Sequence, residues 1–166
     1  MISDKQKNRL GGLVWLWLTL LIVALDQWTK FLAEANLVYL EPIPVMPSFN
    51  LMLAYNKGAA FSFLSDAGGW QRWFFTAAKL IVSAVIIYWL YTLKSSQKWL
   101  AIALALILAG AIGNVWDRIQ LGHVVDFIQL YYQSWYWPAF NIADSAIVVG
   151  AIMLIIDTFR KQPEQS

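Results

Sequence analysis

The chain has 166 residues, of which 60% are hydrophobic and only 13% are charged, and its formal net charge is +2. A soluble domain of this length could not cover so much apolar surface with so few charges, so the composition indicates a membrane protein. The small net charge argues against a nucleic-acid partner. The absence of cysteine excludes disulfides and thiolate chemistry, and a single histidine leaves no histidine pair for a catalytic zinc.

Four apolar segments are long enough to cross a bilayer of ~30 Å. They cover residues 10–25, 73–93, 99–116 and 139–156. We therefore predict a mainly α membrane protein with four transmembrane helices, in which residues 1–166 form a single polytopic domain. Lys79 is the only charge within the second segment. It either extends toward the membrane surface or pairs with a carboxylate, and the sequence leaves both possibilities open.

The distribution of basic residues predicts the orientation of the helices. Seven of the twelve Lys and Arg residues precede the first segment, lie in the short loop after the second, or follow the fourth. The positive-inside rule places these three regions, and hence both termini, in the cytoplasm. Residues 26–72 and 117–138 are then extracytoplasmic. An aromatic belt is expected at the outer interface, formed by Trp28, Trp70, Trp73, Trp135 and Trp137.

The first segment has a second interpretation. Its basic start, its hydrophobic core and the sequence Ala33-Glu34-Ala35 loosely match a cleavable signal peptide. The length of the hydrophobic core favours an uncleaved helix instead.

The outer segment after the first helix is not helical in pattern. VYLEPIPVMPSF contains three prolines, which break helices. FNLMLAYN and AAFSFL flank Asn56-Lys57-Gly58, which is typical of a turn between two short strands. We expect a small extracytoplasmic β-sheet lying on the membrane.

Two carboxylates, Asp126 and Asp144, lie beside strongly apolar sequence. A charge at the bilayer centre costs at least ~2.5–3.5 kcal/mol, so each needs a reason to be there. Asp144 precedes Asp157 by a distance of ~20 Å along a helix, which places it ~10 Å below the outer surface. Asp126 falls in the loop on the same side, so the two can meet. The alternative is structural: Asp144 caps a helix that begins at Asn141, and Asp126 is an ordinary turn carboxylate.

Other polar residues near these segments have simpler interpretations. Asp117 and Arg118 are expected to form an ion pair at the interface, or Arg118 to extend into it. Asp26 and Lys30 are spaced i,i+4, which predicts a pair on the surface of a helix. His123 is expected to be an interfacial polar residue.

The end of the third apolar segment is rich in small residues. Ala109 and Gly113 have the small-xxx-small spacing, with Gly110 beside them, which lets another helix approach closely. Asn114 follows at the depth expected for Asp144.

Five segments in register resemble the motif set of bacterial signal peptidase II, the lipoprotein signal peptidases. They are DQWTK (26–30), AYNKGAAFSFL (54–64), AGAIGNVWDR (109–118), GHVVDF (122–127) and FNIADS (140–145). The chain departs from the family pattern in two places. Ala109-Gly110 stands where the family has a glycine pair, and Lys79 has no role in the pattern.

The resemblance implies a membrane aspartic endopeptidase that removes signal peptides from diacylglyceryl-modified prolipoproteins. Cleavage is expected just before the lipid-modified cysteine, with Asp126 and Asp144 as the catalytic dyad. Substrate-binding or supporting roles are expected for Asn56, Gly58, Gly110, Asn114, Asp117, Arg118, Asn141, Asp26 and Lys30. We expect no cofactor, metal or nucleic acid, and a monomer whose partners are the lipid-modified prolipoprotein and membrane lipids. The resemblance also implies the bacterial cytoplasmic (inner) membrane, with the active site near its extracytoplasmic face.

Other classes of function remain open from the sequence. Lys79 and Ser83, at i,i+4, could form the dyad of a Ser/Lys membrane peptidase. A small transporter or channel could use the intramembrane carboxylates as an ion path. A purely structural membrane subunit is the remaining possibility.

Overall fold

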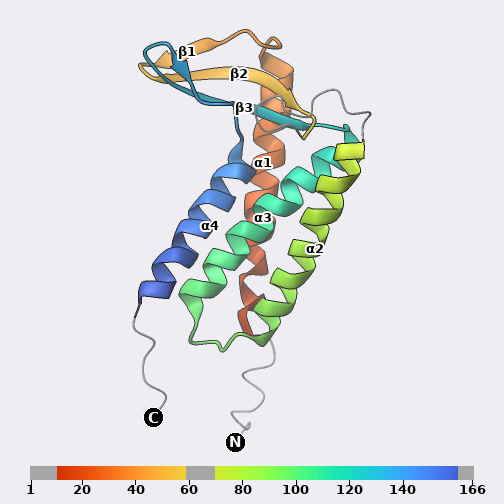
Figure 1. The fold of residues 1–166 in the computed structure, drawn as a ribbon, viewed down its shortest axis with the longest axis vertical. Helices are drawn as coiled ribbons and strands as arrows, with labels where there is room; N and C mark the ends of the chain where they lie inside the picture. The colour runs from red at the N-terminus through yellow and green to blue at the C-terminus, as the bar shows by residue number, and fades with distance from the viewer. Residues whose placement is uncertain (1–10, 59–69, 161–166) are drawn as a thin grey trace, which may run out of the picture.

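The computed structural model describes residues 11–58 and 70–160, and within them four long helices stand below a small sheet (Figure 1). The helices are α1 (Leu16–Asn36, preceded by the 3₁₀ turn η1, Gly11–Trp15), α2 (Trp70–Thr92), α3 (Lys98–Gln120) and α4 (Ile142–Phe159). All four are long and apolar enough to cross a membrane. The predicted architecture of four apolar helices with a small β-sheet is confirmed.

The helices end at different residues from those predicted by hydropathy. α1 continues to Asn36, well beyond residue 25, and α3 continues to Gln120 rather than stopping at 116. α4 begins at Ile142 instead of 139. The polar residues at the outer ends of α1 and α3 end the apolar run but are compatible with a helix, because helix formation does not depend on hydropathy. Asp26 and Asp117 therefore lie inside helices.

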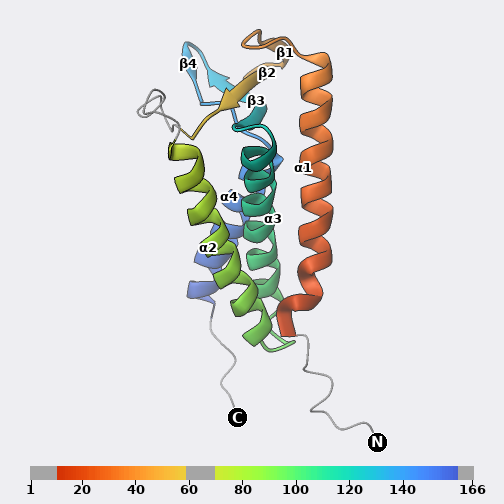
Figure 2. The ribbon, with the colours of Figure 1, turned by 90° about the vertical axis from the view of Figure 1, so that its right-hand side faces the viewer.

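α3 is the central helix of the bundle and packs against α1, α2 and α4 (Figure 2). Most of the apolar stretch of α3 is buried, whereas less than a quarter of the apolar stretch is buried in each of the other three helices. The outward faces of those three helices carry many large hydrophobic side chains, as a lipid-facing surface requires. All five tryptophans of the expected aromatic belt are exposed as well. A buried cluster joins α2 and α3 away from the sheet, formed by Ile86, Leu90, Leu93, Ala101, Leu104 and Leu108.

Glycines bring α3 close to its neighbours, as the small-residue spacing predicted. A Cβ at Gly110 would collide with the backbone oxygen of Ala143 in α4. A Cβ at Gly113 would lie 2.7 Å from Asp26 Oδ2 in α1, and one at Gly150 would lie 2.6 Å from the Ala103 oxygen. α3 therefore touches α1 and the beginning of α4 at two glycines one turn apart.

Gly110→Ala is expected to destabilise the protein by about 1–3 kcal/mol, because α4 must move away to admit a methyl group against its backbone. Thermal unfolding in detergent measures the loss. Ala77→Leu is the control, since Ala77 is exposed on α2 and the added volume meets no neighbouring helix. Equal stability of Gly110→Ala and the wild-type protein would contradict the close α3–α4 contact.

The sheet is antiparallel, with the order β1 (Ile43–Met46), β2 (Phe49–Asn56), β3 (Val124–Tyr132) and β4 (Trp135–Tyr136). The predicted strand FNLMLAYN is β2. The second predicted strand, AAFSFL, lies outside the described residues, and β2 pairs instead with β1 and β3. β1 includes Pro44 but is an edge strand, where a missing N–H is tolerated.

The pairing of β2 with β3 corrects the expected position of Asp126. Its predicted position in a loop is wrong, because it lies within β3, opposite Ala54 of β2. The sheet crosses the ends of α1 and α3 (Figure 1), and β3, which carries Asp126, is one of its strands.

Candidate active site

Two carboxylates from separate elements face the end of the bundle below the sheet. Asp126, on β3, is only 2% exposed, whereas Asp144, in the first turn of α4, is half-buried. Asn141 caps α4, as predicted, because its Oδ1 accepts the backbone N–H of Asp144 at 2.9 Å. The helix start therefore fixes the position of Asp144.

A pair of buried asparagines holds the two acids. Asn141 Nδ2 donates to Asp126 Oδ1 at 2.7 Å, and Asn114 Nδ2 donates to Asp144 Oδ1 at 2.8 Å. The asparagines also contact each other, with 3.3 Å between Asn141 Nδ2 and Asn114 Oδ1. An amide donor orients a carboxyl group without adding a charge, so either acid can carry a proton in this arrangement.

The environment of Asp126 favours its protonated form. Burial, and then the nearby charge of Asp144, raises the pKa of Asp126 to about 7, against the opposing hydrogen bonds from Asn56 and Asn141. This carboxyl group therefore keeps its proton to a higher pH than an ordinary aspartate does. Such a group can both accept and donate a proton under physiological conditions.

Asp126→Asn is expected to stabilise the protein above pH ~7 and to have little effect near pH 4. The folded pKa of Asp126 lies above its unfolded value of 3.8, so the native state loses stability as pH rises from about 4 to about 7. Asparagine removes that loss while its side-chain oxygen still accepts from Asn141. Thermal unfolding of both proteins at pH 4 and pH 8 measures the difference. A variant less stable than wild type at pH 8 would contradict the assignment.

A buried ion triad lies on the α1 side of the acids. Lys30 Nζ is 2.7 Å from Asp26 Oδ2 and 2.8 Å from Asp117 Oδ2, and all three residues are at most 2% exposed. Two predictions are corrected here. The Asp26–Lys30 pair is buried rather than on the surface, because α1 packs this face against α3. Asp117 pairs with Lys30 and not with its neighbour Arg118.

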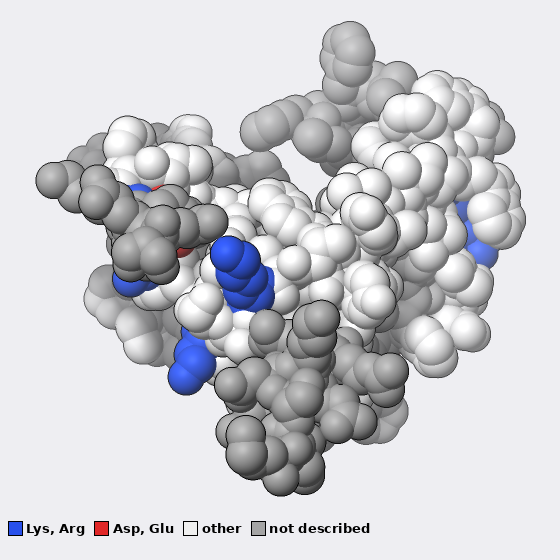
Figure 3. All heavy atoms as spheres, turned by 90° about the horizontal axis from the view of Figure 1, so that it is seen from below, with Lys and Arg blue, Asp and Glu red and all other residues white. Residues whose placement is uncertain are grey.

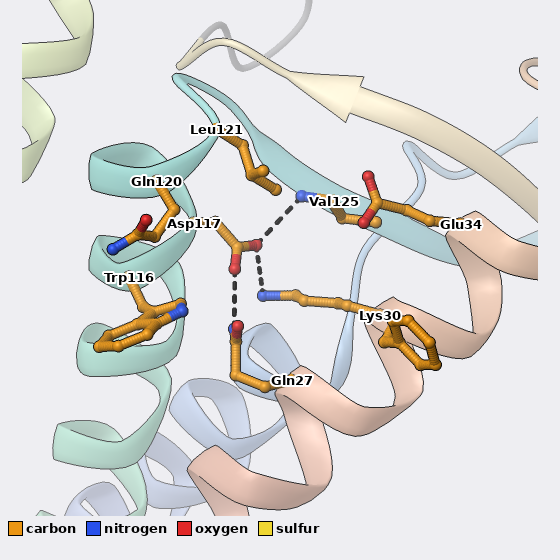
Figure 4. Close-up of a pocket in the computed structure, with 9 residues that line it drawn as sticks. Gln27, Lys30, Glu34, Trp116, Asp117, Gln120, Leu121 and Val125 are labelled. Atoms are coloured by element: carbon orange, nitrogen blue, oxygen red, sulfur yellow. Dashed lines mark hydrogen bonds and ion pairs between the residues drawn. The ribbon is translucent and has the colours of Figure 1, made fainter.

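Each carboxylate of the triad also binds the backbone just before one of the two acids. Asp26 Oδ1 accepts the N–H of Ala143, at 2.8 Å, and Asp117 Oδ2 accepts the N–H of Val125, at 3.2 Å. Figure 4 shows that the Asp117 carboxylate pairs with the Lys30 ammonium and accepts hydrogen bonds from the Gln27 side chain and the Val125 N–H. The residues that follow these two amides are Asp144 and Asp126. Lys30 thus connects the two segments that carry the acids.

A cavity of about 170 Å³ opens beside this triad, between α1 and α3 (Figure 4). Its polar lining includes Gln27, Lys30 and Asp117, and its apolar lining includes Trp116 and Phe31. Neither Asp126 nor Asp144 lines it. The cavity is therefore separate from the acid pair, on the other side of the buried ion triad.

The remaining predicted residues surround the acids from other directions. Arg118 lies on the α2 side. Its Nη1 donates to the backbone oxygen of Asn114 at 3.3 Å, and its Cζ is 5.8 Å from the centre of the Phe75 ring. Asn56 Oδ1 accepts the N–H of Gly58 at 2.9 Å, and Gly58 has a φ of 109°, which favours glycine.

His123 stands outside this group. Its ring packs 4.3 Å from that of Tyr55, and burial lowers its pKa. The interfacial role of His123 stays a prediction.

Gln27 was not among the predicted site residues, yet it donates to Asp117 Oδ1 at 2.7 Å. A signal was available, because Gln27 is one turn before Lys30 on the same helix. The amides of Val125 and Ala143 gave no signal, because the backbone of every residue offers the same donor.

Comparison with known proteins identifies the family. The family described as signal peptidase (SPase) II matches residues 18–160. A lipoprotein signal peptidase of Pseudomonas aeruginosa (strain UCBPP-PA14) is 55% identical over 157 residues, covering 93% of each chain. One from Acinetobacter baumannii (strain ATCC 17978) is 54% identical and covers 93% of this chain and 90% of its own. A solved bacterial membrane enzyme superposes with a TM-score of 0.79 at 28% identity, covering 92% of this chain and 93% of the other. A family match over most of the chain, with relatives above 50% identity along nearly all of it, shows that this chain is a peptidase of the signal peptidase II family.

Proposed function

We propose that this membrane peptidase removes the signal peptide of a diacylglyceryl-modified prolipoprotein with Asp126 and Asp144 as its catalytic pair. The observation that carries the proposal is the arrangement of these carboxylates. They come from a strand and a helix start, two linked asparagines orient them, and the pKa of Asp126 is about 7.

The pair acts with one shared proton. The ionised acid takes a proton from a water molecule as the water oxygen attacks the scissile carbonyl carbon, and the protonated acid donates to the carbonyl oxygen. When the C–N bond breaks, the leaving amine takes a proton from the pair. The half-buried side chain of Asp144 supports water access, and the raised pKa of Asp126 lets the pair hold one proton near neutral pH.

Arg118 and Asn56 are proposed to position the substrate. Arg118 lies on the α2 side of the pair, and Asn56 lies at the end of β2 beside Asp126. Together they limit the space in which a peptide backbone can reach both acids. Gly58 lets the turn after β2 follow that backbone closely.

The orientation of the bundle is proposed to put this site at the extracytoplasmic face. The acids lie at the sheet end, and the opposite end carries the exposed Lys94 and Lys98. Seen from that end, the described surface carries few charged residues, and most of those visible are Lys or Arg (Figure 3). Basic residues at the end away from the site agree with a cytoplasmic position for that end. A cysteine anchored by acyl chains would hold its scissile bond near the membrane surface, at the level of the pair.

The reaction is tested with purified protein and two substrates, a diacylglyceryl-modified prolipoprotein and its unmodified form. Cleavage of the modified substrate alone, immediately before the lipidated cysteine as read by mass spectrometry, is the expected result. Equal cleavage of both substrates, or cleavage at another bond, would contradict the proposed specificity.

The geometry favours the aspartic pair over a Ser/Lys dyad. Ser83 is 7% exposed, and its Oγ donates to the backbone oxygen of Lys79 at 2.8 Å. This is the ordinary hydrogen bond of a serine with the preceding helical turn. The hydroxyl group is thus bound to its own helix rather than to the Lys79 amine.

A further inference from the structure

Lys79 is a charged residue inside the bundle that the proposed mechanism does not use. It lies on α2 at helical spacing from Thr76, Ser83 and Ile86, which are 4%, 7% and 5% exposed. Lys79 itself is half-buried. This face of α2 packs on α3, so Lys79 is directed into the protein rather than toward lipid.

The lysine side chain leans toward the acid pair. Side chains on a helix tilt toward its N-terminus, and the N-terminal end of α2 lies at the sheet end of the bundle (Figure 2). One turn in that direction, Phe75 contacts the guanidinium of Arg118. The charged groups that act on the Lys79 ammonium are Arg118, Asp144, Lys30 and Asp126. Within residues 11–58 and 70–160 it forms no ion pair, so it acts on these groups through its field.

The charges around the site are close to balance only when Lys79 is counted. The cations of the described cluster are Lys30, Lys79 and Arg118, and its carboxylates are Asp26, Asp117, Asp126 and Asp144. With one proton on the acid pair, the cluster is neutral. Net charge is costly away from bulk water, so neutrality favours that state. Arg72, farther out on α2, donates to the backbone oxygen of Ile119. Its charge is the same with and without Lys79, so it does not change the comparison.

We infer that Lys79 is a positioning residue that keeps one proton, rather than two, on the Asp126–Asp144 pair, an inference that rests on the proposed function. Without this cation the cluster reaches neutrality only when both acids are protonated. A doubly protonated pair has no carboxylate to take a proton from water, so it is inactive. Lys79 therefore extends activity to lower pH.

The test compares kcat/KM against pH for the wild-type protein, Lys79→Met and Lys79→Gln on the lipidated prolipoprotein. Removing a positive charge raises the pKa of nearby carboxyl groups, so both neutral variants should shift the acidic limb upward by about 0.5–1 pH unit. Lys79→Arg, which keeps the charge, should restore the wild-type profile. Lys98→Met is the matched control, because it removes the same charge from an exposed site at the opposite end of the bundle.

The possible outcomes separate the inference from the function on which it rests. An acidic limb that stays in place, moves to lower pH, or moves equally in Lys98→Met overturns the role of Lys79 while wild-type cleavage upholds the proposed function. Failure of the wild-type protein to cleave the lipidated substrate overturns the proposed function itself. A uniform loss of activity at every pH, without a shift, would show that Lys79 serves the fold alone and would also overturn the inference.

Discussion

Asp126→Asn and Asp144→Asn are each expected to lower kcat on a lipidated prolipoprotein by about 10³-fold or more. Loss of one carboxyl group removes either the base that activates water or the acid that protonates the carbonyl oxygen, and such groups contribute about 10²–10⁴-fold each. Both acids serve one step, so the double variant should be no worse than either single variant. Turnover in detergent, followed by separation of the lipidated product, measures the effect.

Two controls accompany these variants. Ser83→Ala should keep near-wild-type turnover, because its hydroxyl group only binds the preceding turn of α2. Asp117→Asn should act mainly on stability, because Asp117 binds Lys30 and the Val125 amide. Full turnover in either Asp126→Asn or Asp144→Asn would show that the acids are misassigned.

Lys30→Met is expected to cost about 3–5 kcal/mol of stability and to abolish cleavage. Removing one partner of a buried ion network leaves uncompensated charge, and here two carboxylates lose their common cation. Those carboxylates accept the N–H groups of Ala143 and Val125, so both acid-bearing segments are displaced when the carboxylates lose the cation that holds them together. Thermal unfolding and turnover at pH 7 measure the two effects.

A neutral version of the triad distinguishes lost charge balance from lost packing. Lys30→Met combined with Asp26→Asn and Asp117→Asn should recover part of the stability, because no unpaired carboxylate remains. Lys94→Met, at an exposed site, should leave stability unchanged. If Lys30→Met alone were as stable as the wild-type protein, Lys30 would not hold the two segments together.

The four helices and the Asn141 cap could be predicted from the sequence because both depend on local pattern. An apolar run of sufficient length predicts a membrane helix, and Asn141 three residues before Asp144 is a local capping signal. The outer ends of α1 and α3 could not be placed this way, because Asp26, Lys30 and Asp117 end the apolar runs although they are buried inside the bundle. Hydropathy cannot distinguish a buried polar residue from an exposed one.

Local sequence pattern could not predict the contacts between segments that are distant in the chain. Asp126 lies on a strand because β3 pairs with β2, more than 60 residues earlier in the chain. Asp117 selects Lys30 over the adjacent Arg118 because α1 and α3 cross at Gly113, whereas Arg118 faces α2. The first outcome depends on strand pairing and the second on helix packing, and the sequence indicated the packing only through its small residues.

The most direct test of the central claim is the pH dependence of kcat/KM for the wild-type protein on a lipidated prolipoprotein. A pair that works with one shared proton predicts a bell-shaped profile. Its basic limb should fall near pH 7, where Asp126 loses its proton, and cleavage should decline above that value. A rate that stays constant or rises from pH 7 to pH 10 would contradict an acid pair that works with one shared proton.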